Sequence, residues 1–133
     1  MTKAEFLSRV QAAGGLADHK EAERWSRAVL SALGQLAPDS ETRRQLIAQL
    51  PGFLKTPLLA ETPRALPMGR EALIQHVAAA LDLHARAAER AVRSVYGVLR
   101  SAVSAGELAD FEAKIPPDAA RFLESIGQPP TSE

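Results

Sequence analysis

The stretch KEAERWSRAVLSAL, residues 20–33, is nearly repeated as RAAERAVRSVYGVL, residues 86–99. Six of the fourteen aligned positions are identical, including the Ala-Glu-Arg triplets at 22–24 and 88–90. Weaker matches lie on both sides, and AQLP at 48–51 corresponds to AKIP at 113–116. Self-similarity at a fixed spacing is the signature of an internal repeat. The sequence therefore predicts a tandem duplication of a unit roughly 50 residues long.

Each copy is expected to form three helices. In the first copy these cover about residues 3–13, 18–36 and 39–50, since apolar residues recur there at spacings of three and four. The pair Gly14-Gly15 is expected to end the first helix. Asp18, with Glu21 three residues on, predicts a capping box at the start of the second.

The second copy repeats this plan. Its first helix is expected to be lined by Leu73, Ile74, Val77 and Leu81, and its second by Ala88, Val92, Val95, Leu99 and Ala102. Ser104 with Glu107 predicts a capping box for the third. Asp118 is expected to cap a short last helix.

We therefore expect an all-α fold of six to seven helices, a duplicated three-helix unit packed as an internal pseudo-dimer. One domain would span residues 1–125, with repeat one at 3–54 and repeat two at 70–125. The connector, 55–69, contains three prolines and is expected to be extended, and the tail, 126–133, is expected to be disordered.

Composition excludes several kinds of chemistry. The chain has no cysteine, which excludes disulfides, thiolate metal sites and cysteine nucleophiles. Sixteen basic residues balance sixteen acidic ones without a basic block, which weakens the case for nucleic acid or anionic membranes. Glu5 lies where a signal peptide would need its apolar core, and the longest uncharged run, 28–38, is too short to span a bilayer. We expect a soluble cytoplasmic protein with no membrane contact.

The repeated Ala-Glu-Arg triplets, together with the QLP of residues 49–51 and the apolar positions around them, resemble a bacterial family catalogued as domain of unknown function 2267. The resemblance covers about residues 3–125 and implies a fold but no activity. Residues 2–33 are also similar to the opening helix pair of bacterial histone-like DNA-bending proteins. That pair forms the dimerisation body in those proteins, so the similarity implies that the two copies interlock. The basic ribbon that holds DNA in that family has no counterpart after Leu36, and no DNA-contacting residue is carried over.

A basic stripe on the second helix of each copy is the main repeated polar feature. One interpretation is a paired surface for phosphate, nucleic acid or an acidic partner. A second is a solvated face with ordinary Glu23–Arg27 and Glu89–Arg93 pairs, and a third places the arginines between the copies. The candidate surface consists of Lys20, Arg24, Arg27, Arg86, Arg90, Arg93 and Arg100.

The remaining candidates are few. Trp25, aligned with Ala91, could line an apolar pocket between the copies or fill core space. The three histidines lack a ligand cluster, so surface or capping roles are expected, with no metal and no cofactor. No catalytic constellation is evident. We expect a non-enzymatic interaction or scaffold module with a protein partner or a homodimer; the alternatives are nucleic-acid or anion binding through the stripes, and an apolar ligand near Trp25.

Overall fold

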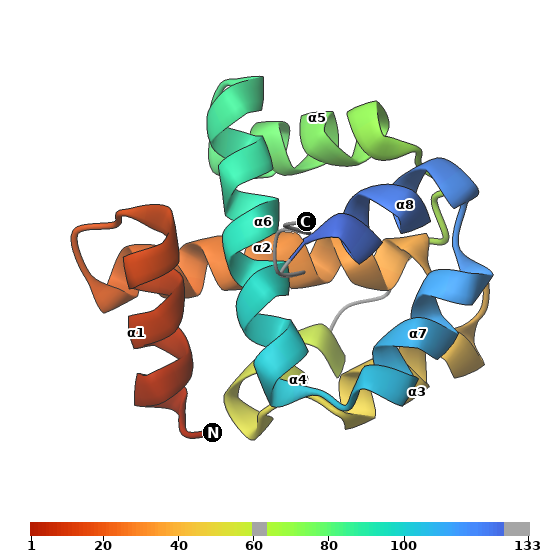
Figure 1. Ribbon diagram of the computed structural model, residues 1–133, viewed down its shortest axis with the longest axis horizontal. Helices are drawn as coiled ribbons and strands as arrows, with labels where there is room; N and C mark the ends of the chain where they lie inside the picture. The colour runs from red at the N-terminus through yellow and green to blue at the C-terminus, as the bar shows by residue number, and fades with distance from the viewer. Residues whose placement is uncertain (60–63, 127–133) are drawn as a thin grey trace, which may run out of the picture.

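The computed structural model describes residues 1–59 and 64–126, and all regular structure within these ranges is α-helical (Figure 1). The described residues form eight helices, one more than the upper expectation. They are α1 Lys3–Gly14, α2 His19–Leu36, α3 Ser40–Ala48, α4 Gly52–Leu59, α5 Arg70–Leu81, α6 Ala85–Ala102, α7 Ala105–Lys114 and α8 Pro117–Ser125. None of these helices combines the length and apolar character needed to cross a membrane.

Local signals place the helix ends close to the predicted positions. Gly15 ends α1 in the left-handed conformation with φ at 65°, which glycine adopts without strain. The Asp18 carboxylate accepts the backbone N–H of Glu21 at 2.9 Å and begins α2. The predicted capping box is only half formed there, because the Glu21 carboxylate accepts from Arg24 instead.

The expectation of an extended connector from residue 55 was wrong for its first part, because α4 forms over 52–59 with Pro57 inside it. A proline in a helix removes one backbone hydrogen bond, but Leu54 and Leu58 are buried on the same face of this short helix. The Arg43 guanidinium also donates to the Leu58 carbonyl at 2.5 Å, which satisfies an acceptor at the helix end. Burial of the leucines outweighs the local preference of the proline.

Two expectations near the C-terminal end are also corrected. Asp118 does not cap α8, which follows Pro116; its carboxylate instead accepts the backbone N–H of Arg70 at 2.7 Å and so caps α5. Ile126, assigned to the disordered tail, is buried, and its carbonyl accepts from Arg100. The rest of the predicted tail, 127–133, lies outside the described residues.

The long helices α2 and α6 cross at the centre of the molecule (Figure 1). The short helix α1 packs on α2 and also on α6, while α5 packs on α6 and also on α2. Helices α3 and α7 lie side by side, α4 packs on α2 and α3, and α8 packs on α5 and α7. The part of the chain before the gap, the first half, and the part after it, the second half, are therefore interlocked.

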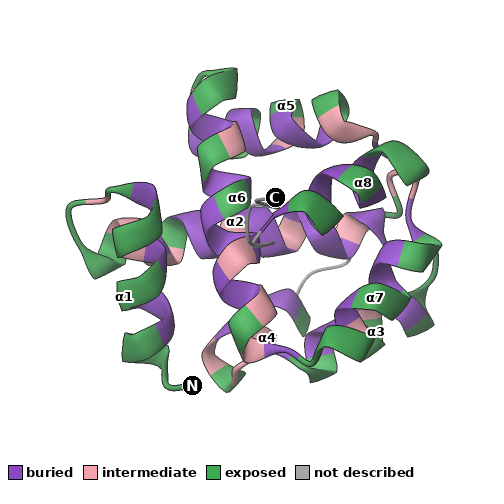
Figure 2. Cartoon of the chain, in the orientation of Figure 1, coloured by how far each residue is buried: buried purple, intermediate pink, exposed green. Residues whose placement is uncertain are grey.

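The two halves share one hydrophobic core. The buried faces of the helices turn toward the crossing of α2 and α6 (Figure 2). The predicted apolar stripe of α2 is fully buried, and on α6 only Ala102 at its end is partly exposed. Burial of apolar surface is the main favourable contribution to folding, so each half depends on the other for stability.

Candidate functional site

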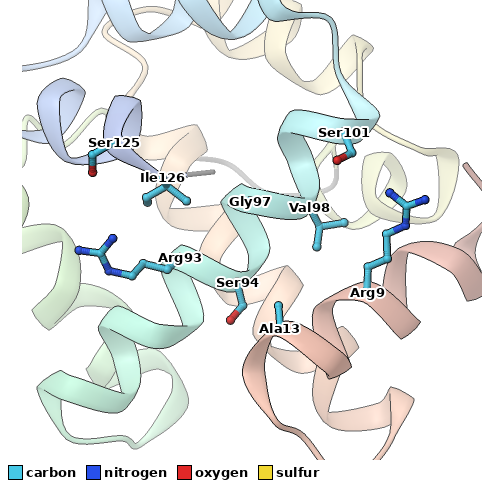
Figure 3. A pocket seen from close by; sticks show the side chains of 9 residues that line it. All are labelled: Arg9, Ala13, Arg93, Ser94, Gly97, Val98, Ser101, Ser125 and Ile126. Atoms are coloured by element: carbon cyan, nitrogen blue, oxygen red, sulfur yellow. The ribbon is translucent and has the colours of Figure 1, made fainter. Parts of the chain in front are cut away.

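An open groove with a volume of 340 Å³ crosses α6 between α1 and the end of α8 (Figure 3). Arg9 on α1 and Arg93 on α6 stand at opposite sides of it (Figure 3). The groove is therefore built from both halves of the chain. Its lining residues are Arg9, Ala13, Arg93, Ser94, Gly97, Val98, Ser101, Ser125 and Ile126.

At the floor of the groove, the α6 backbone is not covered by a side chain at Gly97. A Cβ atom placed on Gly97 would meet nothing closer than Cγ2 of Ile126, at 3.9 Å, which is an ordinary contact. The packing therefore does not require glycine at this position, although glycine weakens a helix interior. What the glycine provides is open space above the helix.

Ser94 places a hydroxyl group at this floor. The residue is only 5% exposed, yet its hydroxyl makes no hydrogen bond to the residues that the structure describes. By contrast, the hydroxyl of the buried Ser26 donates to the Ala22 carbonyl at 2.8 Å. The Ser94 oxygen is not among the buried polar atoms that lack a partner, so it reaches the open space of the groove and can form a hydrogen bond with an occupant.

The groove carries positive charge and no acidic residue among its lining. Arg93 donates through Nε to the Glu89 carboxylate at 2.9 Å, and its guanidinium lies 5.2 Å from the centre of the Phe122 ring. The hydrogen bond from Arg93 lowers the pKa of Glu89. Arg9 is exposed and makes no ion pair within the described ranges. One guanidinium is therefore held in place and the other is free to pair with an anion.

A buried polar network supports one wall of the groove. Glu112, 6% exposed, accepts from the Tyr96 hydroxyl at 2.6 Å and from the Arg100 guanidinium at 2.9 Å. The same guanidinium donates to the carbonyls of Leu123 at 2.9 Å and Ile126 at 2.6 Å. Arg100 thus ties the C-terminal end of α8 to α6 and fixes the position of Ile126 in the groove.

Burial raises the pKa of Tyr96, and the hydrogen bond to the Glu112 carboxylate raises it further. The hydroxyl therefore stays protonated and donates, which is the state that Glu112 requires. The guanidinium of Arg100 lies 5.1 Å from the centre of the Tyr96 ring and opposes this shift only partly. Both hydrogen bonds reach the same carboxylate oxygen, Oε2 of Glu112, and the Arg100 guanidinium compensates the charge of this buried carboxylate.

Several stripe residues proposed from the sequence make contacts inside the molecule. Arg27 pairs with Glu23 at 2.8 Å, the arrangement expected for a solvated face. Arg24 donates to the Leu81 carbonyl of α5 at 3.0 Å, and Arg90 lies over the Trp25 ring of α2 at 5.8 Å. These two arginines each contact the opposite half of the chain.

The remaining stripe residues do not form one cationic face. Arg93 borders the groove and Arg100 is largely enclosed by the network around Glu112. Lys20 and Arg86 are exposed near the starts of α2 and α6 and make no ion pair to the described parts of the chain. The side chains of the stripe residues thus have different environments. Some form ion pairs, some contact the opposite half of the chain, and Arg93 lies at the edge of the groove.

Trp25, the candidate pocket residue, is 2% exposed and does not line the groove. A Cβ atom on Gly14 would lie 2.7 Å from Cζ3 of its ring, so the tryptophan fills its space closely. Two of the three histidines make local contacts: His84 Nδ1 accepts the Ala87 N–H at 3.2 Å as the cap of α6, and His19 forms a hydrogen bond with Ser8. No group of three potential metal ligands occurs within 1–59 and 64–126.

Sequence reasoning found only Arg93 among the groove residues. Arg9, Ser94 and Gly97 belong to different helices or different faces, and only the packing of α1 against α6 brings them together. The one sequence feature that could have indicated the groove was Gly97, because a glycine within a predicted helix suggests that another backbone or a ligand comes close to it.

Comparison with known proteins gives a family but no activity. Residues 3–122 match the family model described as uncharacterized conserved protein (DUF2267). No curated protein matches the chain. The match covers nearly the whole chain, in agreement with the repeated Ala-Glu-Arg triplets and their surroundings. The chain therefore belongs to the DUF2267 family of uncharacterized conserved proteins.

Proposed function

We propose that this chain is a cytoplasmic, non-enzymatic interaction module that binds a protein partner in the groove between α1, α6 and α8. The observation that carries the proposal is the groove itself, an open site of 340 Å³ whose two sides come from different halves of the chain. Ligand sites are typically concave and lie at such junctions.

The proposed origin of this architecture is the tandem duplication, with the two copies packed as an internal pseudo-dimer. The order of helix lengths supports it, because 12 and 18 residues in α1 and α2 recur as 12 and 18 in α5 and α6. The packing of α1 on α6 and of α5 on α2 is the reciprocal arrangement that two interlocked copies would adopt.

The absence of catalysis is part of the proposal, and the groove chemistry supports it. Three serines line the groove, but none of the lining residues is a histidine, a carboxylate or a lysine that would activate a hydroxyl. Binding needs only the arrangement of donors and open space that the groove offers.

Nucleic-acid binding through the stripes receives less support. Arg24, Arg27 and Arg93 are engaged in ion pairs or contacts between the halves, and a phosphate backbone needs several free cations along one track. Apolar-ligand binding near Trp25 is also less favoured, because that ring is buried and closely packed.

A site-specific photo-crosslinker tests the proposal. We would place p-benzoylphenylalanine at Ser101, an exposed groove residue, and at Ala109, an exposed residue of α7 outside the groove. In cells that naturally make the protein, we expect an adduct with a discrete protein at 101 and none at 109. No adduct at 101, or equal adducts at both positions, would refute the proposal.

A further inference from the structure

We infer that the groove binds an extended, acidic segment of a protein partner, with Arg9 pairing with a carboxylate of that segment. This inference rests on the proposed function and names the chemistry of the partner. It follows from three independent features of the groove: its charge, its unpaired hydroxyl and its bare floor.

Charge complementarity indicates an acidic occupant. Arg9 and Arg93 lie on opposite sides of the groove, and no acidic residue lines the space between them (Figure 3). Arg9 lacks an ion pair within the described residues, so a carboxylate entering from solvent finds an uncompensated guanidinium. Arginine binds carboxylates through two parallel hydrogen bonds, which gives both affinity and orientation.

The hydroxyl groups favour an occupant with hydrogen-bonding groups. The Ser94 hydroxyl faces the open space of the groove and has no partner among the residues described, so it can donate to a backbone carbonyl or a carboxylate. Ser125 already donates to the Phe122 carbonyl at 2.6 Å, which leaves its oxygen to accept a backbone N–H. A donor and an acceptor at the same groove match the alternating groups of a peptide chain.

The bare floor at Gly97 favours an extended backbone. A glycine without a packing requirement in a helix interior permits close approach of another chain to the helix. A nucleic acid is less suitable, because the lining holds neither aromatic rings for base stacking nor more than two cations. An extended peptide with acidic side chains uses all three features.

Fluorescence anisotropy with a labelled peptide of alternating glutamate and glycine tests this inference. We expect saturable binding at low ionic strength that weakens as salt is added. Arg9→Gln is expected to reduce the affinity about tenfold, because it removes a charge-assisted pair. Arg44→Gln is the matched control: Arg44 is an exposed arginine of α3 outside the groove, and its loss should leave binding unchanged.

Gly97→Leu should abolish binding by filling the floor of the groove. Circular dichroism on each variant checks that the helices remain folded, and Arg9→Gln carries the test if Gly97→Leu does not fold. The inference is overturned if the peptide does not bind, if Arg9→Gln binds as well as the parent, or if a single-stranded oligonucleotide of equal charge binds more tightly. Peptide failure with a retained crosslink at Ser101 overturns this inference alone, whereas loss of that crosslink overturns the proposed function.

Discussion

The replacement of Arg100 by methionine tests the buried network that holds the end of α8. Arg100 makes three contacts through one guanidinium: to the Glu112 carboxylate, the Leu123 carbonyl and the Ile126 carbonyl, at 2.9, 2.9 and 2.6 Å. Methionine retains much of the apolar stem but none of the donors. The substitution would therefore leave a nearly buried carboxylate with the Tyr96 hydroxyl as its remaining partner.

The magnitude follows from burial. Removal of one partner of a buried ion pair typically costs about 3–5 kcal/mol, because the other charge stays desolvated. The Arg100 side chain is 20% exposed and that of Glu112 is 6% exposed, so water screens the pair only partly, and we expect the lower value, about 3 kcal/mol. For a chain of this size, that corresponds to a fall in melting temperature of roughly 9 °C.

Urea unfolding followed by circular dichroism measures the loss, and a double-mutant cycle assigns it. Glu112→Gln removes the buried charge, so the double variant Arg100→Met/Glu112→Gln contains neither member of the ion pair. We expect the double variant to be no less stable than Arg100→Met alone, which gives a coupling free energy of about 1–3 kcal/mol.

The reasoning would be refuted by a free energy of unfolding for Arg100→Met within about 0.5 kcal/mol of the parent. Additive losses in the cycle would also refute it, since they would show that Arg100 and Glu112 do not stabilise each other.

Three further predictions follow from individual contacts. Burial raises the pKa of Tyr96 in the folded protein above the value of about 10 in the unfolded chain. The stabilising contribution of the Tyr96 hydroxyl is therefore complete below about pH 10, and it decreases above that pH by up to about 1.4 kcal/mol per pH unit. Urea unfolding between pH 9 and 11 should show a steeper loss of stability for the parent than for Tyr96→Phe. Gly14→Ala places a Cβ atom 2.7 Å from the Trp25 ring and should cost about 1–2 kcal/mol, measured by the fluorescence of the single tryptophan during unfolding. Asp118→Ala removes the acceptor for the Arg70 N–H and should cost about 1 kcal/mol in a thermal melt.

Each of these predictions has a control. Equal slopes above pH 9 in the parent and Tyr96→Phe would contradict the first. Gly106→Ala is the control for Gly14→Ala, because a Cβ atom at Gly106 meets nothing within 4 Å and this variant should not lose stability. Equal losses of stability in the two variants would contradict the steric argument. Asp118→Asn keeps an acceptor oxygen and should lose less stability than Asp118→Ala.

The sequence was informative about the helices that follow strong local signals. Helix α2 has a capping residue at Asp18 and an apolar stripe at spacings of three and four, and both are present as predicted. Helix α4 was missed because Pro57 predicts a break, and the burial of Leu54 and Leu58 that overrides it depends on α2 and α3. Local rules contain no information about that contact.

The candidate site was harder to predict for the same reason. Arg93 was named because it repeats Arg27, but Arg9 has no repeated counterpart and becomes relevant only where α1 meets α6. Arg100 looked like an extension of an exposed stripe, whereas the packing of α7 and α8 encloses it beside Glu112. Periodicity shows which face of a helix a residue occupies, but the neighbouring helices decide whether that face is open.

The reciprocal packing of α1 on α6 and α5 on α2 also bears on assembly. Each short helix rests on a long helix from the opposite half, so the contacts do not depend on the two halves belonging to one polypeptide. Two molecules that traded their second halves would satisfy the same contacts, forming an exchanged dimer without any new surface. The covalent link after Leu59 favours the monomer, because it keeps the two halves at a high effective concentration. A higher protein concentration would shift the equilibrium toward the exchanged dimer.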